Sequence, residues 1–143
     1  KSVIVLLEPQ AAMQKIIMAS ELASDLPAVE IDIEQIEQVL LNLAINAFDA
    51  VPAGGTVIFR TSQSEKTIAI KVEDTGGGIA PDAIERIFDP FFTTKEKGSG
   101  LGLSIAQKIV TQHEGKLVAE NTVSGARFSL ILNKSDSHLN YPA

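Results

Sequence analysis

Several residue types are missing from this chain or nearly so. Its 143 residues include no cysteine, no tryptophan, one tyrosine and two histidines. The absence of cysteine excludes disulfides, thiolate metal sites and cysteine nucleophiles, and it favours a cytoplasmic location. With no tryptophan and few other aromatic residues, the chain also offers little surface on which nucleic-acid bases could stack.

Charge and hydropathy exclude two further classes of partner. Eighteen acidic residues against twelve basic ones leave a net charge of −6 at pH 7. Such a surface repels phosphate backbones, so we expect no nucleic-acid partner. No apolar run approaches the roughly 18 residues that span a bilayer, so we expect no direct membrane contact in this segment. The length fits one domain, which we place at residues 1–133, followed by a polar tail at 134–143 that we expect to be disordered.

The clearest helical pattern lies between residues 32 and 50. Asp32 can cap this helix, with Gln35 three residues later as in a capping box. Its sides are mostly apolar, as in a buried helix, with Ile36, Val39, Leu40, Leu43, Ala47 and Ala50 on one face and Leu41, Ile45 and Phe48 on another. Asn42, Asn46 and Asp49 form a polar stripe along its middle. A buried amide left unpaired costs about 1–3 kcal/mol, so a polar partner is expected against this stripe.

Alternating apolar and polar residues predict two antiparallel hairpins. The first joins strands near 57–61 and 68–72 through a short polar link. The second joins strands near 116–120 and 127–132 around Ser124-Gly125.

The remaining segments are read from proline, glycine and apolar residues. Residues 3–17 are apolar enough for a helix, which Pro9 either starts or breaks, and an edge strand is expected to begin near 16–18. Further on we expect a short helix at 81–88, a loop at 89–100 and a helix at 101–112 ended by Gly115. This order predicts an α/β (α+β) two-layer sandwich, with a mixed, mostly antiparallel sheet and helices packed on one face.

Three clusters of residues carry chemistry. The Asn42, Asn46 and Asp49 stripe is either a polar seam satisfied by water and backbone or a row of oxygen ligands that suits Mg²⁺. The segment Asp74-Thr75-Gly76-Gly77-Gly78 follows a strand. It is either an ordinary glycine turn or a carboxylate for an exocyclic amine beside backbone that a flat ligand can approach closely.

The third cluster is the glycine-rich run Gly98-Ser99-Gly100-Leu101-Gly102-Leu103-Ser104 before a helix. It matches neither a Walker A loop nor a dinucleotide fingerprint. Its glycines and the following helix start nevertheless suit phosphate binding. Because each cluster supplies a different part of one site, the three together indicate a site for a magnesium-bound nucleotide.

These clusters resemble the conserved boxes of a known family. QVLLNLAINAFDA at 38–50, EDTGGGI at 73–79, IFDPFFTTK at 87–95 and GSGLGLS at 98–104 resemble the N, G1, F and G2 boxes of sensor histidine kinases. The resemblance covers about residues 22–132. It implies the ATP-binding catalytic domain of a two-component kinase with the Bergerat-type fold, in one superfamily with DNA gyrase B, Hsp90 and MutL. The wording is most similar to that of nitrogen-regulation kinases.

The resemblance also implies roles for individual residues. Asn46 would ligate Mg²⁺, Asn42 would help to hold the phosphates, and Asp74 would bond the adenine amino group. Lys95 would neutralise the γ-phosphate, with Lys97 as an alternative. Asn42 and Lys95 are the expected catalytic residues. The full set expected to contact Mg-ATP is Asn42, Asn46, Asp49, Asp74, Gly76, Gly78, Ile79, Phe88, Phe91, Thr94, Lys95, Gly98, Ser99, Gly100, Leu101, Gly102 and Leu103.

The chain departs from the family pattern in three places. Asp49 stands where many histidine kinases have a lysine, and Gly125-Ala126-Arg127-Phe128 lacks the usual hydroxyl next to the glycine. His113 and His138 both follow the ATP boxes. We interpret His113 as a solvated residue at a helix end and expect the phosphoacceptor histidine to lie outside this chain.

The resemblance further implies partners. The domain would phosphorylate a histidine on the dimerisation domain of the same kinase and reach a response regulator through that domain. The isolated domain is expected to be monomeric and the full-length kinase homodimeric. Two alternatives remain: an ATPase or serine kinase of the same fold, or a catalytically silent nucleotide-binding or interaction module. The first is disfavoured because Asn42 stands where those relatives have a glutamate that serves as the base.

Overall fold

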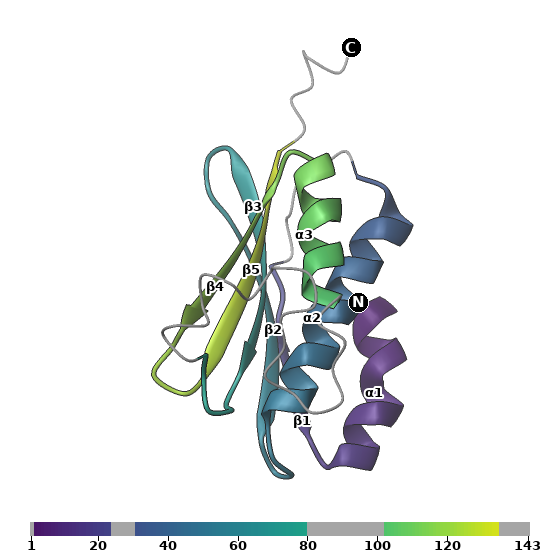
Figure 1. Ribbon diagram of the computed structural model, residues 1–143, viewed down its shortest axis with the longest axis vertical. Coiled ribbons are helices and arrows are strands. Elements are labelled where there is room, and N and C mark those ends of the chain that lie inside the picture. Colours follow the sequence, from purple (N-terminus) through teal and green to yellow (C-terminus); the bar gives the residue numbers. More distant parts are fainter. Residues whose placement is uncertain (1, 24–30, 80–101, 135–143) are drawn as a thin grey trace.

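A five-stranded sheet with three helices on one face makes up the described part of the protein (Figure 1). This computed structural model describes residues 2–23, 31–79 and 102–134. The strands follow the order β1-β2-β3-β5-β4 across the sheet. Their bounds are β1 (Ile17–Glu21), β2 (Thr56–Gln63), β3 (Thr67–Asp74), β4 (Lys116–Asn121) and β5 (Ala126–Asn133).

The strand pairing confirms the predicted sandwich with its mixed sheet. β2 and β3 form one antiparallel hairpin and β4 and β5 the other, and β3 pairs antiparallel with β5. Only the pairing of β1 with β2 is parallel, among the strands described. The chain can make this parallel pair because the helix α2 lies between the two strands in sequence and crosses over the sheet.

α2 (Ile33–Ala50) begins as its sequence predicts. The Asp32 side chain accepts a hydrogen bond from the backbone N–H of Gln35 at 3.1 Å, which satisfies one of the free donors at the helix start. The face toward the core buries Ile36, Val39, Leu43, Ala44, Ala47 and Phe48. The expectation that the helix is buried on most sides is wrong at Ile45, which is 41% exposed.

α1 (Ser2–Gln14) contains Pro9 inside the helix rather than at its start. Val3, Leu7 and Ala11 are buried against the core, whereas Val5 and Pro9 are exposed. Proline removes the N–H that would bond to the carbonyl of Val5. That carbonyl belongs to a residue on the exposed side of the helix, where water can replace the missing donor.

α3 (Gly102–Gln112) ends at Gln112 as predicted, but Gly115 is not the left-handed residue that follows it. Glu114, not Gly115, adopts the left-handed conformation after the helix, with φ of 58°. The N–H of Gly115 then bonds to the carbonyl of Val110 and the N–H of Glu114 to that of Thr111, both at 2.9 Å. This is the hydrogen-bond pattern that normally places glycine at the left-handed position.

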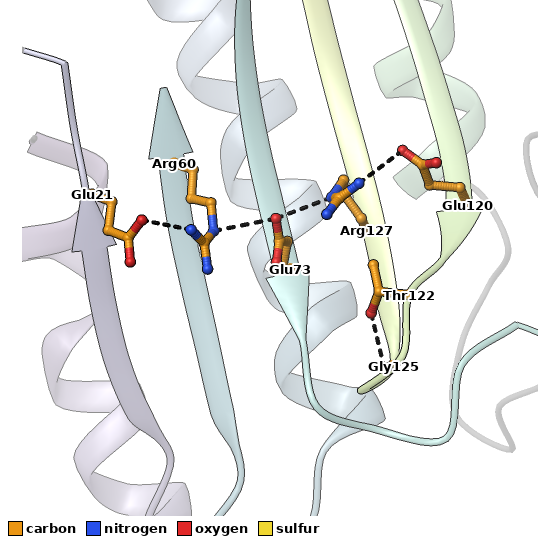
Figure 2. Close-up of polar contacts among 7 residues, drawn as sticks. All are labelled: Glu21, Arg60, Glu73, Glu120, Thr122, Gly125 and Arg127. Carbon is orange, nitrogen blue, oxygen red and sulfur yellow. Dashed lines mark hydrogen bonds and ion pairs between the residues drawn. The ribbon is translucent and has the colours of Figure 1, made fainter. Parts of the chain in front are cut away.

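The two faces of the sheet differ in character. Toward the helices, the sheet and α2 bury a continuous apolar core whose largest members include Phe48, Phe128, Leu43, Leu130, Val57 and Val72. The opposite face carries a row of alternating charges that crosses all five strands, Glu21, Arg60, Glu73, Arg127 and Glu120 (Figure 2). Because side chains alternate along a strand, polar residues on this face leave the apolar face uninterrupted.

Candidate nucleotide-binding site

The polar stripe of α2 meets the start of α3. The Nδ2 group of Asn42 donates to the carbonyl oxygen of Gly102 at 3.0 Å, and Gln38 donates through Nε2 to the Oδ1 atom of Asn42 at 3.1 Å. The predicted polar partner of the stripe is thus the first residue of α3. Asn46 is half-buried one turn later, and Asp49 is exposed.

Asp74 ends β3 on the helix-facing side of the sheet and is only 3% exposed. Its Oδ1 atom accepts a hydrogen bond from the N–H of Gly76 at 2.8 Å. The N–H of Ala126 on β5 also bonds to this carboxylate. Burial raises the pKa of Asp74 above its ordinary value, and these two N–H donors oppose that shift.

Two glycines allow this carboxylate to be enclosed. A Cβ atom on Gly76 would lie 2.3 Å from the carbonyl oxygen of Ala50 in α2. A Cβ atom on Gly125 would lie 2.2 Å from the carbonyl oxygen of Asp74 and 2.8 Å from its Oδ1. The acid–glycine turn, which we define as residues 74–79, therefore packs between the end of α2 and the β4–β5 turn, and no side chain fits at either contact.

Asn121, at the end of β4, is a residue of this region that sequence reasoning missed. Its Oδ1 atom accepts from the N–H of Ile79 at 2.6 Å, and its Nδ2 group donates to the carbonyl of Ile79 at 2.9 Å. The two residues are 42 positions apart. No local sequence pattern predicts such a contact, because the contact depends on the position of β4 at the edge of the sheet.

The predicted site residues fall into two groups. The structure brings Gly102 against Asn42, packs Gly76 against α2 and places Gly78 and Ile79 beside Asn121. Leu103 packs partly buried against the core. The predicted residues Phe88, Phe91, Thr94, Lys95, Gly98, Ser99, Gly100 and Leu101 lie outside the described residues, as do the predicted short helix, the loop and His138.

The interpretation of His113 as a solvated residue is wrong. The side chain is half-buried, with Nδ1 2.9 Å from the carbonyl of Ile109 and Nε2 accepting from the N–H of Asp32 at 3.0 Å. Nδ1 must therefore carry the proton. The imidazole joins the end of α3 to the cap of α2, which leaves neither nitrogen available for a substrate.

Metal and membrane signatures were sought over the same ranges. Within 2–23, 31–79 and 102–134, no group of three or more His, Cys, Asp and Glu side chains is arranged to hold a metal ion. None of the helices in those ranges combines the length and the hydropathy of a bilayer-crossing segment.

Comparison with known proteins assigns the family. The profile of the histidine kinase-, DNA gyrase B- and HSP90-like ATPases matches residues 31–136. This chain belongs to that family. Membership of an ATPase family implies that the domain binds ATP, in agreement with the expected cofactor.

Sensor kinases are among the relatives in sequence. The signal transduction histidine-protein kinase AtoS of Escherichia coli (strain K12) is 42% identical over 131 residues, which cover 90% of this chain and 22% of AtoS. The chain thus spans about a fifth of the length of this curated relative.

Solved structures give the same fold. The nucleotide-free catalytic domain of histidine kinase ThkA has a TM-score of 0.86 at 35% identity, covering 94% of this chain and 91% of that one. Full-length ShkA in complex with AMPPNP has a TM-score of 0.84 at 31% identity, covering 94% of this chain and 29% of that one. The described fold is that of a histidine kinase catalytic domain.

Proposed function

We propose that this domain binds Mg-ATP and donates the γ-phosphoryl group to a histidine on a dimerisation domain outside these 143 residues. The observation that carries the proposal is the Asp74 carboxylate, buried at the end of β3 and held by the N–H groups of Gly76 and Ala126. A carboxylate fixed in this way can accept a hydrogen bond from the exocyclic amine of adenine. Nucleotide binding by the similar ShkA is consistent with this role.

The phosphates would lie at the start of α3. The first N–H groups of a helix have no partners within it, and the helix end attracts anions. Asn42 ties this end to α2 through the carbonyl of Gly102. The triphosphate would therefore lie against the α2 stripe, with Lys95 or Lys97 as the cation on the γ-phosphate.

Asn46 is the residue we assign to Mg²⁺. An amide oxygen is a hard ligand that suits this ion, and Mg²⁺ bound to nucleotides takes most of its other ligands from phosphates and water. A single amide oxygen is therefore a sufficient protein ligand, and no group of three or more metal-binding His, Cys, Asp or Glu side chains is needed. Among the described residues there is no such group. When bound, the ion would neutralise charge on the phosphates.

The transfer needs little chemistry from the protein. The lone pair on an imidazole nitrogen of the acceptor attacks the γ-phosphorus, an N–P bond forms, the bond to the β–γ bridging oxygen breaks, and ADP leaves. The phosphorylated ring then loses the proton on its other nitrogen to solvent. Since imidazole is its own nucleophile, no general base is required. At position 42 the stripe carries the amide of Asn42 rather than a carboxylate. An amide cannot act as the base that activates water or a hydroxyl group. This favours transfer to histidine over an ATPase or a serine kinase.

The same proposal covers the partners. The immediate partner is the helical dimerisation domain of the same kinase, and a response regulator would receive the phosphoryl group from it. We propose a monomer for the isolated domain and a homodimer for the whole kinase.

Labelled ATP tests the proposed transfer. The domain is mixed with the purified phosphoacceptor domain of the same kinase and ATP labelled at the γ-phosphate. We expect acid-labile, base-stable label on the acceptor with the wild type, and none with Asp74→Asn or Asn46→Asp. The first change replaces the carboxylate that accepts from adenine with an amide that carries an NH2 donor, and the second sets a negative charge beside the phosphates. Asn133→Ala, at an exposed amide that bonds to the carbonyl of Glu114, is the matched control and should transfer normally.

Other outcomes would contradict the proposal. Release of free phosphate without labelled acceptor would identify an ATPase. Calorimetric binding of ATP with neither product would identify a silent nucleotide-binding module. Unchanged ATP affinity in both site variants would show that the nucleotide binds elsewhere.

A further inference from the structure

We infer that Asn121 is a positioning residue for the nucleotide, which acts by clamping the far end of the acid–glycine turn. The inference rests on the proposed ATP site, because it assigns the turn a ligand. Asn121 itself need not touch that ligand.

The clamp consists of two hydrogen bonds to one residue. Asn121 uses both the acceptor and the donor of its amide, so it pairs with the N–H and the carbonyl of Ile79 as one β-strand pairs with another. The contact is tight, since a Cβ atom on Gly78 would lie 2.9 Å from the Oδ1 atom of Asn121.

The near end of the turn is held by different contacts. The side-chain oxygen of Thr75 accepts from the N–H of Thr56 at 2.9 Å, and the N–H of Thr75 bonds to the carbonyl of Thr56 at 3.1 Å. Gly76 bonds to the Asp74 carboxylate. Among the described residues, only Asn121 is seen to bond to Ile79.

The support of the clamp is itself rigid. Asn121 pairs with Ala126, whose N–H also bonds to Asp74. The intervening turn is closed by two bonds between Thr122 and Gly125. The N–H of Thr122 donates to the Gly125 carbonyl at 2.8 Å. The N–H of Gly125 donates to the Thr122 hydroxyl at 3.0 Å (Figure 2). One hairpin end therefore fixes both the carboxylate and the last residue of the turn.

A loose turn would weaken binding without removing any ligand contact. If the Ile79 end is free, the turn samples conformations that do not bind, and the apparent affinity falls by the fraction of molecules that are competent. Aspartate cannot replace asparagine here, because it keeps the acceptor for the N–H of Ile79 but sets a carboxylate against the Ile79 carbonyl. Alanine removes both bonds.

Calorimetric titration with ATP, combined with backbone amide exchange in the nucleotide-free domain, tests the clamp. Asn121→Ala loses both hydrogen bonds, and Asn121→Asp loses one and gains a repulsive contact with the Ile79 carbonyl. In each variant we expect the Kd for ATP to rise about tenfold. The amide proton of Ile79 should exchange faster than in the wild type. Asn133→Ala loses one exposed amide-to-backbone bond at the other end of the sheet, and it should change neither quantity.

Each contrary result has a distinct meaning. Unchanged exchange at Ile79 in Asn121→Ala would overturn the clamp. Faster exchange with unchanged ATP affinity would overturn its role in positioning the nucleotide. An equal loss of ATP affinity in Asn133→Ala would show that the Asn121 variants act by lowering the overall stability of the domain, which would overturn a specific positioning role. Failure of the wild type to bind ATP would instead overturn the proposed function, and Ile79 exchange would still report whether the clamp exists.

Discussion

At the scale of single residues, the free-energy cost of burying the charged Asp74 carboxylate links the stability of the domain to its proposed function. The side chain is 3% exposed, and burial raises its pKa despite the two N–H groups that bond to it. The charged form is therefore less favourable in the folded domain than in the unfolded chain. Such a group lowers the stability of the empty protein and becomes useful only when a ligand donates a hydrogen bond to it.

The pH dependence of stability follows from this shift. Since the folded domain holds the Asp74 proton more tightly than the unfolded chain does, the free energy of unfolding falls as pH rises from about 4, the ordinary pKa, through the raised value. Asp74→Asn removes this contribution. We expect the nucleotide-free variant to gain stability relative to the wild type as pH rises from 4 to 7, measured by urea unfolding.

A control variant and a contrary outcome make this prediction testable. Glu65, in the link between β2 and β3, is exposed, so Glu65→Gln serves as a matched loss of one carboxylate. A difference between Asp74→Asn and the wild type that stays constant from pH 4 to 7 would show that burial does not destabilise the Asp74 charge.

At the scale of the elements, specific hydrogen bonds at the helix ends determine where α2 begins and where α3 ends. α2 begins at a side-chain cap, and the N–H of the same capping residue bonds to His113 at the end of α3. α3 ends on a left-handed Glu114. The cap followed directly from sequence because it joins residues three positions apart. The role of His113 did not, because its partner is 81 positions away.

Removal of the α2 cap has a defined expected effect. Asp32→Ala deletes the acceptor for the N–H of Gln35 but leaves the backbone bond to His113 intact. We expect a loss of about 1 kcal/mol in the free energy of unfolding, measured with urea, because this is the usual contribution of such a cap. Asp32→Asn, which can cap equally well, should retain most of the stability. Equal losses in both variants would point to the charge rather than the hydrogen bond.

At the scale of the whole molecule, the row of charges on the open face joins every strand of the sheet (Figure 2). Glu73 is its centre, since it lies 3.2 Å from Nε of Arg60 and 3.0 Å from Nε of Arg127. A hydrogen bond from Arg127 to Glu73 is the main cause that raises the pKa of Arg127. The side chain of Glu73 is 14% exposed, against 65% for Glu21 at the edge.

This contrast in exposure predicts unequal effects. Glu73→Gln leaves two arginines without their shared carboxylate, and we expect it to lower the free energy of unfolding by about 1–2 kcal/mol. Glu21→Gln removes an exposed pair and should cost less than about 0.5 kcal/mol. Urea unfolding of both variants measures the difference, and 1 M salt should shrink the smaller effect further. Equal effects would mean that the row contributes only as separate surface pairs.

The sequence by itself determined the local structure and the family of this protein. The helical periodicity, the Asp32 cap and the two hairpins depend on residues that are close in the chain. Their interactions can therefore be predicted without knowledge of the tertiary structure. The ordered boxes predicted an ATP-binding histidine kinase domain, which the family match bears out. The nitrogen-regulation subtype and the roles of the individual site residues remain predictions.

Only the tertiary structure decided what surrounds those residues. The parallel pairing of β1, the burial of Asp74, the grip of Asn121 on Ile79 and the charge row all depend on strand order and register. These contacts join segments far apart in sequence, and a residue's spacing along the chain carries no information about which distant backbone group it will meet. Burial and the enclosure of a charge are properties of the packed sheet and helices, so they exist only once the chain has folded.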